Sequence, residues 1–194
     1  MKKFIFVLAA AIATIMFFNS YSSAMEMAPT GWGKDFSDAV SQGDAYFVKC
    51  EYARALESYE HAEELAPHAA QASYKIALTM YRWGNGIQAR REDLWPLAIK
   101  KVERTLYLDP TFADAVFLLG VLRYRMGDFK SAVQIYKSIS EIRQGDPDLY
   151  MDIAVAAWRA GDMKLSSAAL ERARALTPSS TRLHSIAREI FSSR

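Results

Sequence analysis

The side chains that could bind a metal or support catalysis are few and scattered in this sequence. The three histidines are His61, His68 and His184, and Pro67 separates the first two, so they are not expected to share one helix face. No cysteine lies close to them, whereas zinc sites combine histidine with cysteine or carboxylate ligands at short, regular spacings. We therefore expect no metal site and no bound cofactor.

Two further patterns that could support chemistry are weak. The adjacent carboxylates Glu63 and Glu64 would need burial and perturbed ionisation to act as an acid–base pair, and a solvated helix surface explains them equally well. The segment Gly84-Asn85-Gly86 lacks the third glycine and the preceding strand of a phosphate-binding loop. The sequence therefore predicts a protein that is not an enzyme.

The elements that position the remaining residues are helices, and the run from Ala113 to Asp146 shows their pattern most clearly. Apolar residues at helical spacing predict a first helix that ends at Gly127, where glycine suits a left-handed turn. A second helix follows and carries Ala132 and Tyr136 on one face. The small residues Gly120 and Ala132 let the two backbones approach closely, so each helix buries its row of apolar side chains against the other helix.

Equivalent positions recur along the chain at a fixed interval. The turn residue recurs as Cys50, Gly84, Gly127 and Gly161, and the small residue of the first helix as Gly43, Ala77, Gly120 and Ala154. The large residue of the second helix recurs as Tyr59, Val102, Tyr136 and Leu170. Successive members are 34 residues apart, except for one interval of 43 in each series, so one repeat carries nine extra residues.

A period of 34 residues with these marks resembles the tetratricopeptide repeat (TPR) family. The resemblance covers Phe36 to Ser180 and is clearest in LLGVLRYRMGDFKSAVQIY. It implies an all-α fold, a right-handed α-solenoid of four TPR helix hairpins plus a C-terminal capping helix. The expected repeats are 36–69, 70–112, 113–146 and 147–180, and the expected capping helix is 181–194.

The nine extra residues belong to the second repeat. They fall at 85–93, between Gly84 and Leu94, and predict an enlarged loop between the two helices of that repeat. Pro96 is then expected in the first turn of the following helix, where its missing N–H costs little.

The first helix of each repeat carries a second stripe, roughly 130° around the helix from the stripe that packs within the repeat. We call it the inner stripe. Its members are Val40, Asp44 and Phe47; Tyr74, Leu78 and Tyr81; Phe117, Val121 and Tyr124; Met151, Val155 and Trp158. A surface helix is usually polar at such positions, whereas these residues are mostly apolar. The resemblance implies that the stripe lines a concave groove, the binding face of TPR proteins; packing between repeats is the alternative explanation.

These residues predict a non-enzymatic scaffold that binds a protein or peptide partner in the groove. An arginine follows the stripe in repeats two to four, and the expected partner-binding residues are Phe47, Tyr74, Leu78, Tyr81, Arg82, Phe117, Val121, Tyr124, Arg125, Met151, Val155, Trp158 and Arg159. Aromatic burial should set affinity, while the arginines should set orientation and prefer an acidic or C-terminal group. A self-assembling homo-oligomer is the alternative, and an enzyme or small-molecule binder that uses 85–93 is less favoured.

Residues 1–24 have the pattern of a secretory signal peptide. Two lysines precede an apolar stretch from Phe4 to Phe18, and Ser22 and Ala24 fit a cleavage site. We expect cleavage after Ala24, a flexible leader at 25–35 and a periplasmic bacterial protein; an uncleaved inner-membrane anchor is the alternative. Family analogy then suggests envelope assembly, pilus biogenesis or secretion, or cytochrome maturation.

The charge balance and the single cysteine limit which partners and which disulfides we expect. Loss of Lys2 and Lys3 would leave 22 basic and 22 acidic side chains, so we expect no nucleic-acid partner. Cys50 is the only cysteine, and no disulfide can form within one chain. Its register favours a small buried turn residue, and the alternative is a thiol that forms an intermolecular disulfide or responds to oxidation.

Overall fold

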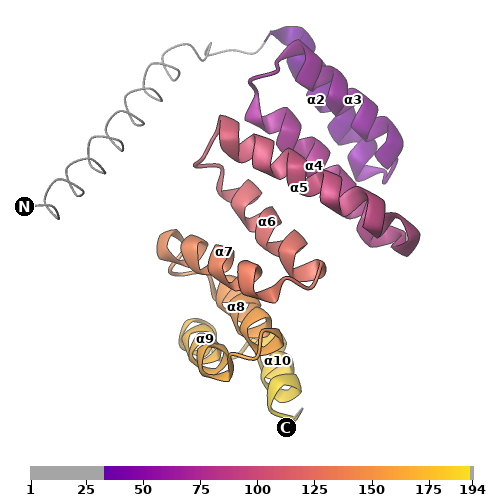
Figure 1. Ribbon diagram of the computed structural model, residues 1–194. Helices are drawn as coiled ribbons and strands as arrows, with labels where there is room; N and C mark the ends of the chain where they lie inside the picture. The colour runs from indigo at the N-terminus through magenta and orange to yellow at the C-terminus, as the bar shows by residue number, and fades with distance from the viewer. Residues whose placement is uncertain (1–32, 193–194) are drawn as a thin grey trace, which may run out of the picture. The chain divides into compact units, whose positions relative to one another are not determined.

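The computed structural model describes residues 33–192 of the chain (Figure 1). The expected signal peptide at 1–24, and all but the last residues of the expected leader at 25–35, lie outside the described residues. A compact unit begins at Asp35. No helix among the described residues is both long enough and apolar enough to cross a membrane.

Within residues 33–192 the chain forms four helix hairpins and a final helix, which confirms the predicted all-α solenoid. The first helices of the hairpins are α2 (Lys34–Val48), α4 (Ala70–Gly86), α6 (Ala113–Arg125) and α8 (Pro147–Arg159). The second helices are α3 (Tyr52–Leu65), α5 (Arg91–Leu108), α7 (Phe129–Ile142) and α9 (Met163–Leu176). The final helix is α10 (Thr181–Ser192), which packs on α8 and α9 (Figure 1).

Pairs of small and large residues hold the two helices of a hairpin together. A Cβ atom added to Gly43 would lie 2.5 Å from the ring of Tyr59, and one added to Gly120 would lie 2.5 Å from the ring of Tyr136. Only a glycine leaves room for these rings, which are themselves buried. The recurring small and large positions in the sequence are therefore the packing contacts of the hairpins.

The turns between the paired helices follow the predicted register in three of the four repeats. Cys50, Gly127 and Gly161 all have a positive φ, of 60°, 85° and 83° respectively. Gly84 behaves differently, because it is buried inside α4, which continues to Gly86. A Cβ atom at Gly84 would lie 2.7 Å from Nε1 of Trp95, so glycine is needed there for the close approach of α5.

The predicted enlarged loop at 85–93 is wrong. The helices of this repeat are longer instead: α4 has 17 residues and α5 has 18, against 13 for α6 and 14 for α7. Only a short connection remains, which contains a 3₁₀ turn, η1 (Gln88–Arg90). The extra helical residues are stabilised because Arg91 donates a hydrogen bond to the carbonyl of Gly84 and the Trp95 ring is buried against α4. Since α5 begins at Arg91, Pro96 is its sixth residue, and the prediction that it lies in the first turn is also wrong.

Two buried clusters form the core of this unit. One is built on α3, α4, α5 and α6, and the other on α7, α8, α9 and α10. The two faces of α6 serve different clusters: Leu118 and Leu122 are buried in the first, whereas Phe117 and Tyr124 pack against the second. The inner-stripe residues of α6 therefore connect repeats three and four.

Candidate protein-binding face

Most of the inner stripe is partly exposed in the structure. Half-buried members are Phe47, Tyr74, Leu78, Tyr81, Phe117, Val121, Tyr124, Val155 and Trp158, and the neighbouring Arg82, Arg125 and Arg159 are exposed. Apart from Val155, each half-buried apolar residue from repeats two to four packs against one of the two clusters. These side chains thus form the outer surface of the core on one side of the first helices.

Met151 was predicted to contact a partner, and this prediction is wrong, since the side chain is only 1% exposed. Its burial follows from the docking of α10 on α8. Arg182 of α10 donates hydrogen bonds of 2.5 Å to Asp148 and 2.7 Å to Asp152 on α8, and Leu183 is buried in the same cluster as Met151. Burial raises the pKa of Asp152 although Arg182 opposes the shift. Val40, at the other end of the stripe, is also buried.

The polar member of the stripe, Asp44, is engaged within the chain. Tyr59 donates a hydrogen bond of 2.5 Å to its carboxylate, and the Lys75 ammonium donates one of 2.7 Å to the same oxygen. Burial, together with this hydrogen bond, raises the pKa of Tyr59. The charge of Lys75 is therefore neutralised at the surface between the first two repeats.

The aromatic rings of the stripe are held by other rings of the chain. Ring centroids lie 4.9 Å apart for Tyr74 and Phe112, 6.2 Å for Tyr81 and Trp95, 5.7 Å for Phe117 and Tyr136, and 5.3 Å for Tyr124 and Phe129. Packing within the array, the alternative explanation for these aromatics, thus accounts for part of each ring's surface. The rest of each ring is accessible to a partner and is already fixed in orientation.

Groups from several first helices influence the ionisation of Tyr136. Burial raises the pKa of Tyr136, and the Asp152 carboxylate and the hydroxyls of Tyr81 and Tyr124 raise it further. These groups come from α8, α4 and α6. Tyr81 and Tyr124, which are 43 residues apart in the sequence, thus both influence the ionisation of the same second-helix tyrosine.

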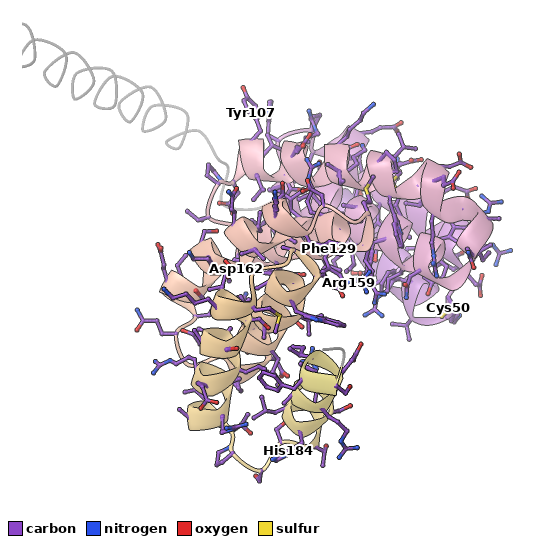
Figure 2. All side chains as sticks on the ribbon, turned by 60° about the horizontal axis from the view of Figure 1, so that its bottom comes forward. Cys50, Tyr107, Phe129, Arg159, Asp162 and His184 are labelled. Atoms are coloured by element: carbon purple, nitrogen blue, oxygen red, sulfur yellow. The ribbon has the colours of Figure 1, made fainter. Side chains whose placement is uncertain are left out.

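The arginine row is exposed and largely unpaired. The Arg159 guanidinium lies 4.9 Å from the ring centroid of Phe129 and 6.0 Å from that of Trp158 (Figure 2). Within residues 33–192, no carboxylate lies within 4.0 Å of Arg82, Arg125 or Arg159. Sequence reasoning missed Phe129 as a member of this face. The available signal was its place at the start of the second helix, which puts it at the same end of the hairpin as the last turn of α6.

Cys50 is exposed, so the prediction of a buried turn residue is wrong. It stands at the α2–α3 turn, near the edge of the molecule in Figure 2, and lines a shallow cleft of about 350 Å³ with Tyr52, Arg54 and Trp83. The Cys50 side chain, two residues before Tyr52, and partial burial raise the pKa of the Tyr52 phenol. The alternative of an accessible thiol is the one that agrees with the structure.

The described residues offer no metal centre. Among residues 33–192, no group of three or more histidine, cysteine, aspartate or glutamate side chains is placed to hold a metal ion. Nδ1 of His61 lies 3.7 Å from the Glu64 carboxylate on the exposed surface of α3. Nδ1 of His184 lies within hydrogen-bond distance, 2.8 Å, of the Ser180 carbonyl oxygen near the start of α10.

Comparison with known proteins agrees with the repeat architecture. The family model described as tetratricopeptide repeat matches residues 124–190, and no curated protein sequence matches the chain. MamA from Desulfovibrio magneticus RS-1, solved from residue 41 to its end, is similar in fold with a TM-score of 0.71 and 14% identity over 84% of this chain and 94% of that one. A tetratricopeptide repeat protein from Parabacteroides merdae gives a TM-score of 0.70 and 11% identity over 83% of this chain and 62% of that one.

A third similar structure is the TPR2B domain of yeast Sti1 in complex with pHsp70. Its TM-score is 0.51, with 17% identity over 70% of this chain and 98% of that domain. Identities this low establish a shared fold only. The 34-residue period, the helix hairpins and the family match over residues 124–190 together support the resemblance of this chain to the tetratricopeptide repeat proteins.

Proposed function

We propose that this protein is a non-enzymatic scaffold that holds a segment of a partner protein against the inner stripe. The observation that supports the proposal is the row of half-buried aromatic and aliphatic side chains on α4, α6 and α8, beside exposed arginines. Tetratricopeptide repeats are typical of protein–protein interaction, and the yeast Sti1 domain of similar fold was solved in complex with pHsp70.

The magnitude of the apolar contribution is sufficient for specific binding. If a partner covers ~50 Å² on each of Tyr81, Tyr124 and Trp158, then at ~25 cal/mol per Å² each ring contributes ~1 kcal/mol. The three rings together contribute ~4 kcal/mol before the cost of ordering the partner. Because their orientations are already fixed by Trp95, Phe129 and the second core cluster, little of this gain is lost in ordering the scaffold itself.

A capture experiment tests the proposal. The wild-type protein and a Tyr124→Ala, Trp158→Ala variant are used as bait in an extract of the native organism, and retained proteins are identified by mass spectrometry. The control is Tyr107→Ala, which removes an aromatic that is 74% exposed on α5 and lies well apart from Phe129 and Arg159 in Figure 2. Thermal unfolding verifies that each variant is folded. We expect the partner to be lost with the double variant only; equal retention by all three baits would refute the binding face.

We also propose that the protein acts outside the cytoplasm. The basis is the signal-like pattern of residues 1–24 in the sequence, and a role in the assembly of envelope structures is consistent with it. Fractionation of cells that express the full chain, followed by N-terminal sequencing, distinguishes a periplasmic protein cut after Ala24 from an uncleaved membrane-anchored one. A cytoplasmic full-length product would contradict export.

A self-assembling homo-oligomer is the second candidate function. The observation that favours it is the exposed thiol of Cys50. Oxidation of the Cys50 thiols of two copies, with molecular oxygen as the electron acceptor, would form an intermolecular disulfide and a dimer that reductant dissociates. Sedimentation of the protein with and without reductant, beside a Cys50→Ser variant, measures this directly. A monomer under every condition would eliminate the candidate.

A further inference from the structure

Some charged side chains beside the inner stripe form ion pairs within the chain, and others do not. Lys75 is paired with Asp44, Asp152 with Arg182, and Arg123 lies 3.6 Å from Glu103. In contrast, the arginine that follows the stripe in repeats two, three and four has no carboxylate within 4.0 Å in the part of the chain that the structure describes. These residues are Arg82, Arg125 and Arg159. The face therefore carries a row of three arginines that form no ion pair with the described residues.

Arg159 is the best prepared of the three to receive an anion. Its guanidinium stacks on Phe129 at 4.9 Å and borders Trp158 at 6.0 Å, and Phe129 is itself held by Tyr124. A stacked guanidinium keeps the N–H groups on its edge free for a bidentate bond with a carboxylate. Because the group is already held on rings, less side-chain freedom is lost on binding than for an unsupported arginine.

We propose that the segment held by the inner stripe is acidic, and that Arg159 is its principal charged contact, with Arg82 and Arg125 receiving further carboxylates. The inference rests on the proposed binding function of this face and specifies the chemistry of the partner. The aromatic row supplies apolar contact, and the three arginines beside it supply positive charge with no ion-pair partner among the described residues, whereas the nearby Asp128 and Asp162 carboxylates already cap helices α7 and α9.

The repeat geometry also indicates how the carboxylates are spaced. The three arginines lie on successive first helices, and α4 contacts α6 directly. Packed helices are ~8–10 Å apart, and an extended chain advances ~3.3 Å per residue. A carboxylate at every third residue of an extended segment therefore matches the step from Arg82 on α4 to Arg125 on α6, with apolar residues between them facing the rings.

Two synthetic peptides test the inference. The first is fluorescein-labelled and has glutamate at every third position between tyrosine and leucine residues; the second is identical except that glutamine replaces glutamate. We expect the acidic peptide to bind the full protein ~10-fold or more tightly than the amide peptide, since a charge-assisted hydrogen bond contributes at least this much. Added salt should weaken the binding of the acidic peptide only.

Variants of the protein locate the contact. Arg159→Gln should weaken the acidic peptide ~10-fold and leave the amide peptide unchanged. The matched control is Arg172→Gln, which removes another exposed arginine that stacks on a ring, here Tyr150 at 5.8 Å, but on the second helix α9. This control should leave both affinities unchanged.

The outcomes separate the inference from the function on which it rests. Equal affinities for the two peptides, both lost in the Tyr124→Ala, Trp158→Ala variant, would overturn the acidic preference and leave the binding face intact. Equal weakening of the acidic peptide by Arg159→Gln and Arg172→Gln would also overturn it. Binding of either peptide that the Tyr124→Ala, Trp158→Ala variant fully retains would contradict the binding face itself.

Discussion

Replacement of Gly84 by alanine tests whether this glycine serves packing rather than a turn. The added Cβ would lie 2.7 Å from Nε1 and 2.9 Å from Cδ1 of Trp95, a buried ring whose indole donates to the carbonyl of Tyr81 at 3.3 Å. Overpacking of this kind costs ~1–3 kcal/mol, and the tight fit places Gly84 in the upper half of that range. Alanine regains ~1 kcal/mol of helix propensity, so the net loss in the free energy of unfolding is ~1–2 kcal/mol.

The same helix offers a matched control. Gly86 is the last residue of α4, and a Cβ atom there has no neighbour within 4 Å. Gly86→Ala should leave the free energy of unfolding unchanged or raise it by up to ~1 kcal/mol. The assay is thermal unfolding followed by circular dichroism, in which Gly84→Ala should lower the Tm by ~2–8 °C.

The result that would refute this reasoning is equal stability of the two variants, because the contact between Gly84 and Trp95 would then be absent. The substitution also bears on binding, since the Tyr81 ring rests 6.2 Å from Trp95. A displaced Trp95 should weaken partner binding, whereas Gly86→Ala should not change it.

Three other perturbations have defined outcomes. Burial alone would raise the pKa of Glu63, but hydrogen bonds from Lys101 and Ser73 lower it below its usual value. The ionised Glu63 carboxylate therefore stabilises the folded protein above the unfolded-state pKa, and this stabilisation is lost as the pH falls through the folded-state pKa. Glu63→Gln should therefore cost ~1–3 kcal/mol at neutral pH, and urea unfolding should show that this difference shrinks in acid. Cys50→Gly should raise the free energy of unfolding by ~1 kcal/mol, because φ is +60° at that turn and glycine adopts a positive φ without strain. Cys50→Ala keeps the Cβ atom and therefore the strain, and it is the control in the same urea titration. Arg182→Gln should release α10, which hydrogen exchange would detect as faster exchange in α10 and around Met151, with no change in α3.

The fold could be predicted from the sequence because each repeat restates the same packing contacts. Gly43 against Tyr59 and Gly120 against Tyr136 are close approaches that require the small residue, so their spacing alone reveals the hairpin. The inner stripe could be predicted for a related reason. The helical angle fixes which side chains share a face, and that face is half-buried at every position except Val40 and Met151, which are buried.

The errors arise where a distant part of the chain decides the local structure. Asn85 and Gly86 are typical of a loop, yet burial of Trp95 against α4 stabilises helix on both sides of a short connection. Met151 has the register of a binding residue, but α10, which lies beyond the last repeat, covers it. No periodic pattern contains this information, because each contact occurs once in the chain.

Hydrogen exchange of the protein alone and in complex with its captured partner tests the central claim most directly. If the inner stripe binds the partner, amides of α4, α6 and α8 should gain protection in the complex, while those of α5, α7 and α9 should exchange as in the free protein. Protection confined to the second helices would contradict the account, since it would place the partner on the other side of the array.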